Sequence, residues 1–130
     1  MKNIFVWIFL RILPAAIMLQ TLYFKFSGAP ESIYIFSTIG MEPWGRYAVG
    51  IGELIAGVLL LVPKLSWIGA LLGVGLMSGA IFFHMAFLGI QVQNDGGQLF
   101  AMALVVFIAC FAHLVMERQR IFSLLKLFKK

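Results

Sequence analysis

Hydrophobic residues fill four long stretches of this chain, and polar or glycine-rich segments separate them. The stretches cover residues 4–24, 44–62, 67–88 and 98–116. A helix needs roughly 20 residues to cross a hydrocarbon core about 30 Å thick, and each stretch is close to that length. The pattern therefore predicts an all-α integral membrane protein whose four spanning helices form a bundle.

The segments between the stretches predict how the helices are connected. Residues 63–66 make a turn so short that the helices on either side form an antiparallel hairpin, and residues 89–97 are polar and glycine-rich, as in a solvent-exposed loop. The first loop has a helix-start signal at Pro30 and Glu31 and a stop signal at Gly40. We therefore expect a short interfacial helix there, lying over the outer mouth of the bundle.

The tail at residues 118–130 is basic and amphipathic. Apolar residues alternate with cationic ones at helical spacing, a pattern typical of helices that lie on anionic membrane surfaces. We expect the tail to continue the fourth helix and to rest on the inner leaflet. A frayed, solvated end is the alternative.

Composition favours the membrane and excludes an ordinary soluble domain. Hydrophobic residues make up 62% of the 130 positions and charged residues 12%, whereas soluble domains contain about 25% charged residues. Four spans use most of the chain, so we expect a single transmembrane domain over residues 1–130. Because hydrophobicity continues past Arg11 to Phe24, we expect the first stretch to be a span and not a cleaved signal peptide.

Basic residues are distributed unevenly between the two ends of the predicted bundle. Eight of the ten fall on one side of a four-span topology: Lys2, Arg11, Lys64, Arg118, Arg120, Lys126, Lys129 and Lys130. Lys25 and Arg46 fall on the other side. Positive charge accumulates on the cytoplasmic side of membrane proteins, so both termini are predicted to be cytoplasmic. Topology thus accounts for the net charge of +5, and we expect no nucleic-acid partner.

Ionisable residues within the spans are costly in hydrocarbon and are expected to face the bundle interior. Depth along the helices divides them into two groups. The outer group is Lys25, Glu53 and His84, and the inner group is Arg11, His113 and Glu117. We take the outer group as the candidate ligand-binding residues and the inner group as a structural polar cluster.

Glu53 is the most informative of these residues. A lone charged side chain at the centre of a spanning helix costs roughly 2.5–3.5 kcal/mol, and pairing with a cation at the same depth lowers that cost. Lys25 is the nearest cation in depth, and its long stem can reach down from the interface. We predict an ion pair, with snorkelling of Lys25 to water as the alternative. Such a pair fits a clamp between helices at least as well as a catalytic role.

The two histidines are at opposite ends of the bundle, so a bis-histidine haem is excluded. His84 fits either a ligand-binding group or, slightly better, a ring bonded to a backbone carbonyl. His113 and Glu117 form an i,i+4 pair that Arg11 can join, which predicts a tether between helices. Three or four clustered ligands for zinc or iron cannot be assembled, and the lone Cys110 allows no CxxC pair. We expect no metal and no intrinsic cofactor.

Four short motifs occur in order along the chain: KFSGAPE at 25–31, IGMEP at 39–43, GIGELIAGVLLLVP at 50–63 and MSGAIFFH at 77–84. Their order and spacing resemble the DoxX-like family of small four-helix bacterial membrane proteins. The family takes its name from a small subunit of a thiosulfate:quinone oxidoreductase, and some relatives look like assembly factors. The resemblance implies a multi-pass protein of the bacterial inner membrane, with functional interest at Lys25, Glu53 and His84. It does not transfer thiosulfate chemistry, because the chain has no cysteine pair or metal site.

Two functions from different classes remain. In the first, the protein is a membrane subunit of a quinone-linked redox system, with an outer-leaflet pocket for a quinone or another amphipathic small molecule. In the second, it is a non-catalytic scaffold or assembly chaperone for a partner membrane protein. Both make it a subunit or accessory protein rather than a complete enzyme. GxxxG matches at 69–73 and 75–79 fit close packing within a monomer or in a homodimer. The sequence names neither the substrate nor the partner.

Overall fold

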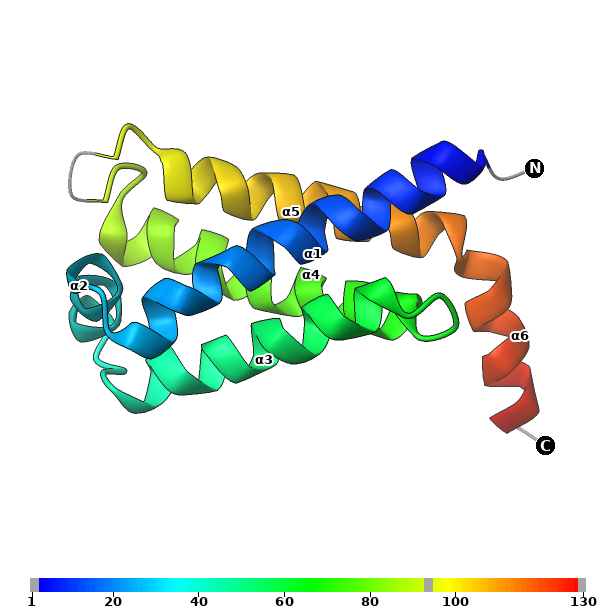
Figure 1. The fold of residues 1–130 in the computed structure, drawn as a ribbon, viewed down its shortest axis with the longest axis horizontal. Coiled ribbons are helices and arrows are strands. Elements are labelled where there is room, and N and C mark those ends of the chain that lie inside the picture. Colours follow the sequence, from blue (N-terminus) through cyan, green and yellow to red (C-terminus); the bar gives the residue numbers. More distant parts are fainter. Residues whose placement is uncertain (1–2, 93–94, 129–130) are drawn as a thin grey trace.

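The computed structural model describes residues 3–92 and 95–128 of the chain. Four long helices lie side by side, each antiparallel to its neighbours (Figure 1): α1 (Ile4–Ser27), α3 (Trp44–Leu61), α4 (Ser66–Phe83) and α5 (Gln98–Met116). Three short elements complete the described part: α2 (Pro30–Thr38), the π-helical turn η1 (His84–Leu88) and α6 (Arg118–Phe128). We call the two ends of the bundle the α2 end and the α6 end.

Four helices are long and apolar enough to cross a membrane: α1, α3, α4 together with η1, and α5. This confirms the predicted all-α membrane bundle. The spans differ slightly from the expected bounds, because α1 continues to Ser27 before Gly28 ends it in a left-handed conformation at φ 71°. The last turn of the third span is a π-helix, closed by a 2.7 Å hydrogen bond from the Gly89 N–H to the His84 carbonyl.

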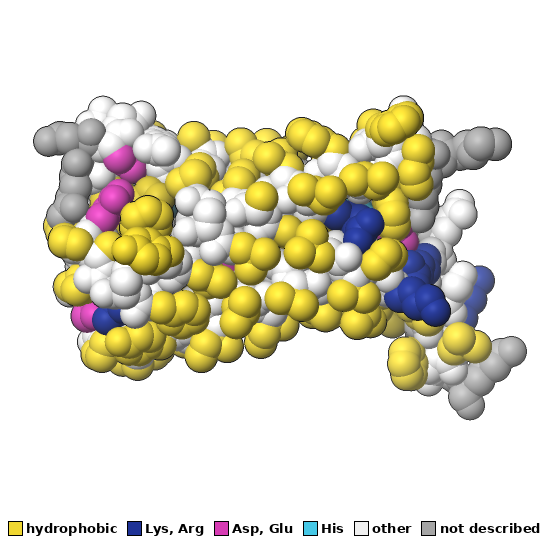
Figure 2. All heavy atoms as spheres, in the orientation of Figure 1, with side chains coloured by type: hydrophobic (Ala, Val, Ile, Leu, Met, Phe, Trp, Pro, Cys, Tyr) yellow, Lys and Arg dark blue, Asp and Glu magenta, His cyan; other side chains and the backbone are white. Residues whose placement is uncertain are grey.

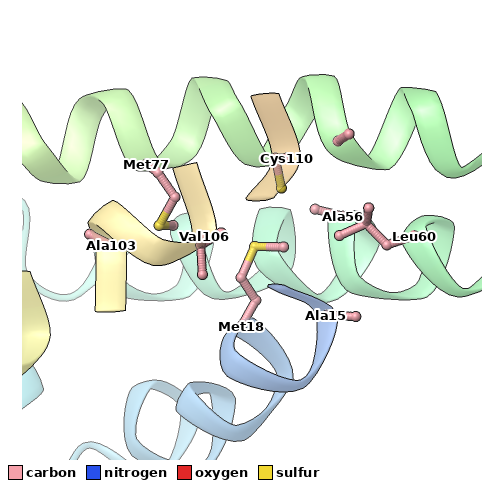
Figure 3. Packing of buried hydrophobic residues seen from close by; sticks show 9 residues of the cluster. Ala15, Met18, Ala56, Leu60, Met77, Ala103, Val106 and Cys110 are labelled. Carbon is pink, nitrogen blue, oxygen red and sulfur yellow. The ribbon is translucent and has the colours of Figure 1, made fainter. Parts of the chain in front are cut away.

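The four spans form a ring in which α1 packs on α3, α3 on α4, α4 on α5, and α5 on α1. The centre of the ring is filled by buried residues from all four spans, among them Met18, Leu60, Met77 and Val106 (Figure 3). Small residues bring the helices close together at this level. A Cβ at Gly69 would stand 2.7 Å from the Ala56 carbonyl oxygen, so the backbones of α3 and α4 are in direct contact there.

The outer face of the bundle is apolar between its two ends. Figure 2 shows hydrophobic side chains along the length of the drawn face, with Lys and Arg gathered at one end and most of the Asp and Glu at the other. Of the expected basic set, Lys2, Lys129 and Lys130 lie outside the described residues.

The basic tail does form a helix, but it does not continue α5 in line. The chain turns at Glu117, and α6 then runs off at an angle to the bundle (Figure 1). Phe122 is 60% exposed and Phe128 is 85% exposed. An exposed apolar side next to cationic residues fits the interfacial position expected from the sequence, which stays a prediction.

Candidate functional site

A cavity of about 470 Å³ occupies the α2 half of the bundle. Its wall is mostly apolar and includes residues of α1, α2, α3, α4, η1 and α5. Lys25, Glu53 and His84 all line it. The three residues that the sequence grouped by depth therefore lie around a single space, although they come from three different elements.

Glu53 is held by two residues of α1. Lys25 Nζ lies 3.0 Å from Glu53 Oε1, and Thr21 Oγ1 donates a hydrogen bond of 2.8 Å to Glu53 Oε2. Each carboxylate oxygen therefore has a donor, although the Glu53 side chain is only 5% exposed. The predicted ion pair is present, and Lys25 does not simply snorkel to water.

Thr21 was not among the site residues chosen from the sequence. Its hydroxyl lies 3.4 Å from Lys25 Nζ, so it touches both members of the ion pair. Thr21 and Lys25 are one helical turn apart on α1, which places both on the face that meets α3. The i,i+4 spacing of Thr21 and Lys25 is the sequence signal that could have identified Thr21 as a site residue.

His84 begins the π-helical turn and is buried. Its Nδ1 lies 3.1 Å from the carbonyl oxygen of Gly89, and because a carbonyl only accepts hydrogen bonds, Nδ1 carries the proton. In the neutral ring Nε2 is then an acceptor. The ring is bonded to a backbone carbonyl, as one of the two interpretations expected, and it also lines the cavity. Ligand binding by His84 stays a prediction. The edge of the ring packs on Phe100, 5.5 Å between centroids.

Arg46 contacts the backbone of Lys25 and does not itself line the cavity. From the sequence, Arg46 was used only as a charge for topology, and this contact was not predicted. The guanidinium is bound to the Glu42 carboxylate, with Nη2 at 2.9 Å from Oε1 and Nε at 3.0 Å from both oxygens. Its Nη1 donates to the backbone carbonyl of Lys25. Arg46 thus fixes the end of α1 against the start of α3, and so positions the lysine. The i,i+4 spacing of Glu42 and Arg46 was the available sequence signal.

The short helix α2 covers the cavity at one end of the bundle (Figure 1). Glu31, Ser32 and Phe36 line the space, and both Ser32 and Phe36 are buried. The sequence predicted this helix and its position over the mouth. It did not identify Glu31 as a lining residue, because Glu31 was used there only as a helix-start signal.

Asp95 organises the loop between His84 and α5. Its carboxylate accepts hydrogen bonds from the N–H groups of Val92 (3.1 Å), Gly97 (2.8 Å) and Leu99 (3.2 Å). Burial alone raises the pKa of Asp95, but the three backbone donors together lower it below the ordinary value. The ionised side chain therefore caps α5 and holds the loop beside the site.

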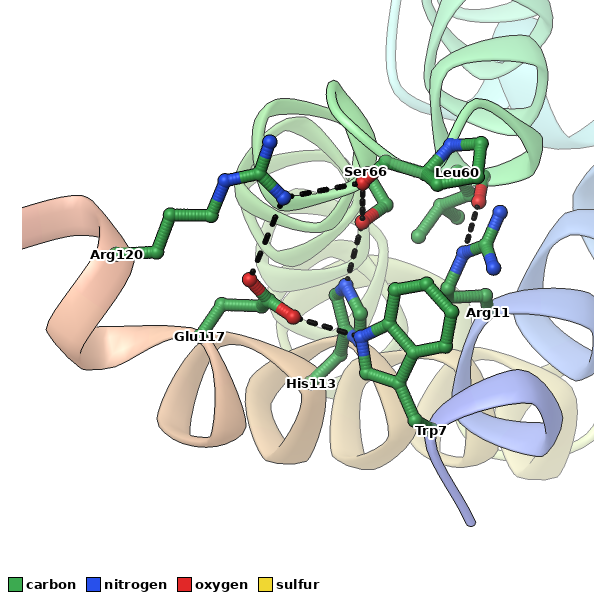
Figure 4. A network of polar contacts seen from close by, with 8 residues as sticks. Trp7, Arg11, Leu60, Ser66, His113, Glu117 and Arg120 are labelled. Carbon is green, nitrogen blue, oxygen red and sulfur yellow. Dashed lines mark hydrogen bonds and ion pairs between the residues drawn. The ribbon is translucent and has the colours of Figure 1, made fainter. Parts of the chain in front are cut away.

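The inner group lies at the α6 end and takes no part in the cavity (Figure 4). Trp7 Nε1 donates to Glu117 Oε1 at 2.6 Å, and His113 Nε2 lies 2.9 Å from the Ser66 hydroxyl. Arg11 Nε donates to the Leu60 carbonyl at 2.8 Å. Because these contacts join α1, α3, α4 and α5, the cluster acts as a tether between helices.

Arg11 joins this cluster in a way that the sequence did not predict. It caps the last carbonyls of α3, with Nη2 at 2.9 Å from the Leu61 oxygen. Its guanidinium also lies over the Trp7 ring, 4.3 Å from the centroid, and Trp7 in turn binds Glu117. Arg11 is thus linked to Glu117 through the indole.

Among residues 3–92 and 95–128, no three His, Cys, Asp or Glu side chains are grouped as metal ligands. The family model described as DoxX matches residues 6–86 of the chain. That range contains Lys25, Glu53 and His84, and it ends before α5. No curated protein and no solved structure matches the chain.

Proposed function

This chain belongs to the DoxX family and is a multi-pass membrane protein, and from that premise we propose that it is a membrane subunit of a quinone-linked redox system. Its cavity binds the head group of a quinone or of another amphipathic small molecule. The observation that carries the proposal is the convergence of Lys25, Glu53 and His84 on one cavity. Its volume, about 470 Å³, lies within the range of about 300–1,000 Å³ typical of small-molecule sites.

The charges around the cavity favour an uncharged, hydrogen-bonding head group. Lys25 is already neutralised by Glu53 at 3.0 Å, so a free anion gains little from the lysine. An ammonium group has three N–H donors, and Glu53 and Thr21 account for two of them. The third can donate to a quinone carbonyl, while His84 Nε2 can accept from the hydroxyl of a quinol.

We also propose an orientation in the bacterial inner membrane. Arg11, Lys64, Arg118, Arg120 and Lys126 belong to the α6 end, and the cavity belongs to the opposite end. The positive-inside rule then places α6 in the cytoplasm. The cavity opens towards the outer leaflet.

The second candidate is a non-catalytic scaffold or assembly chaperone. The contacts of Glu53 with Lys25 and Thr21 favour it, because they satisfy the buried carboxylate without a ligand. If the protein is a scaffold, Lys25, Thr21 and Glu53 only hold α1 against α3, and it is the outer surface of the bundle that contacts a partner membrane protein.

Binding of a quinone probe distinguishes the two candidates. We expect the protein in mild detergent to bind 2,3-dimethoxy-5-methylbenzoquinone with a decyl chain, measured by quenching of tryptophan fluorescence. His84→Gln should weaken binding about fivefold, since a hydrogen bond contributes about 1 kcal/mol. His113→Gln is the matched control, because it makes the same change at a histidine outside the cavity, and it should have less than about a twofold effect.

Equal weakening by both variants would mean that the probe does not bind in the cavity. If the wild-type protein binds no quinone, and mass spectrometry of the purified protein finds no stoichiometric amphiphile, the scaffold function is favoured.

A further inference from the structure

A second hollow lies on the lipid-facing side of the bundle, between α3 and α4. Its volume is about 540 Å³, and every residue lining it is apolar or glycine: Ile55, Leu59, Ile68, Leu71, Leu72, Gly75 and Leu76. Ile55 is 47% exposed and Leu71 is 55% exposed, so the hollow is a groove open to lipid.

The groove and the cavity share two residues. Gly75 and Leu76 line both of them, so the cavity and the groove adjoin at one turn of α4. Ile68 lies seven residues earlier on the same helix, at the other limit of the groove on α4. The groove therefore extends about 10 Å along α4, away from the cavity and towards the α6 end.

The glycines of α4 differ between its two halves. At Gly69 an added Cβ would meet the Ala56 oxygen and the Leu60 nitrogen of α3, both at 2.7 Å. At Gly75 and Gly79 an added Cβ would meet nothing within 4 Å. The first half of α4 is thus in backbone contact with α3. In the second half the Leu76 side chain still packs on α3, 3.3 Å from a Cβ built at Gly52, but open space adjoins Gly75 where the two hollows meet.

We propose that the turn at Gly75 and Leu76 is a lateral portal, through which a hydrocarbon chain leaves the cavity and lies in the groove between α3 and α4. The inference rests on the proposed function and specifies its ligand as a membrane amphiphile with a long isoprenoid or acyl chain. The head group meets Lys25, Glu53 and His84, and the chain meets the branched aliphatic residues of the groove. Because the chain is surrounded by hydrocarbon whether or not it is bound, it gains affinity through van der Waals packing on the groove residues and not through leaving water.

The test compares two benzoquinones with the same ring, 2,3-dimethoxy-5-methylbenzoquinone with and without a decyl chain. In Gly75→Leu the added side chain enters open space at the portal and should exclude the chain from it, which weakens the decyl probe about fivefold. Leu71→Trp is a second variant, at a residue that lines the groove and not the cavity. It should also weaken the decyl probe, and the chainless ring should bind to it within about twofold of the wild-type affinity.

The matched control is Ser78→Leu, on the same turns of α4. Ser78 is exposed and lines neither hollow, so the same side chain there should alter the binding of neither probe. Comparing variants at a fixed detergent concentration removes the effect of probe partitioning into micelles.

The outcomes separate the portal from the cavity. If the chainless ring binds and neither Gly75→Leu nor Leu71→Trp weakens the decyl probe, the portal is wrong and the head-group site stands. If Ser78→Leu weakens the decyl probe as much as Gly75→Leu does, the portal is also wrong. If the wild-type protein binds neither probe, the proposed quinone function fails, and the portal fails with it.

Discussion

Glu53 can occupy the bundle interior because α1 supplies a donor to each of its oxygens. Lys25 carries a formal charge and Thr21 does not, so the two contacts differ in what their loss leaves behind. Removing only the cation leaves a buried carboxylate with one hydroxyl, whereas removing the carboxylate leaves a lysine that is 17% exposed and able to reach water.

We therefore predict that Lys25→Met destabilises the protein more than Glu53→Gln. The loss for Lys25→Met should reach about 3 kcal/mol, as for the breaking of a buried ion pair, and the neutral amide of Glu53→Gln should cost less. Thermal unfolding in detergent of both single variants and the double variant measures this. Additive effects within about 0.5 kcal/mol would show that the two side chains are not coupled.

The sequence predicted the outer group because depth along a helix follows directly from residue number. Lys25, Glu53 and His84 were placed at one level, and all three line the cavity. The supporting contacts of Arg46 were not predicted. They depend on which carbonyl and carboxylate happen to lie within reach, and this is set by the packing of α1 on α3.

Among the elements, the spans were predictable and the irregular turns were not. Length and hydropathy define a span, and α1, α3 and α5 begin where the apolar stretches begin. The π-helical turn at His84 and the break at Glu117 depend on single hydrogen bonds, such as that from Gly89 N–H to the His84 carbonyl. Hydrophobic periodicity carries no information about them.

At the start of α5, we predict that the cap formed by Asp95 depends on pH. The pKa of Asp95 in the folded protein lies below its ordinary value of 3.8. The ionised carboxylate therefore contributes its full stability at pH values above 3.8. The contribution is lost as the pH falls through the lower folded pKa. Asp95→Asn, which removes the charge and keeps the shape, should cost about 1 kcal/mol near neutral pH, because hydrogen bonds to a charged acceptor are stronger than those to a neutral one.

Melting temperatures of the wild-type protein and Asp95→Asn between pH 3 and 7 measure the difference. We expect the gap to be constant from pH 7 to about pH 4.5 and to narrow below about pH 4. A gap that widens on acidification would contradict the assignment of Asp95 as an ionised cap.

At the scale of the whole molecule, the two ends of the bundle differ in charge and in packing. The α6 end carries most of the basic residues and the tether of Trp7, Arg11, His113 and Glu117. The α2 end carries Glu31, Glu42 and Asp95 together with the cavity. The sequence predicted the charge asymmetry, but no pattern in it predicted the volume or the wall of the cavity, because a void is a property of how six elements pack.

We predict that the α6 end is cytoplasmic. A reporter fused after Lys130 should report the cytoplasm, and one inserted next to Asp95 should report the opposite compartment, because basic residues remain on the cytoplasmic side. As a control, moving positive charge to the α2 end, for example Glu31→Lys with Glu42→Lys, should weaken the preference. The same compartment for both reporters would contradict the four-span topology.

The contrast between the packed and the open half of α4 has a mechanical consequence. Because α3 and α4 are in backbone contact at Gly69, whereas a Cβ at Gly75 would meet nothing within 4 Å, lateral pressure from the acyl chains has more room to act on the cavity half of this helix pair. We expect a bilayer with a higher lateral pressure at the level of the cavity to reduce the cavity volume and to leave the packing at Gly69 unchanged.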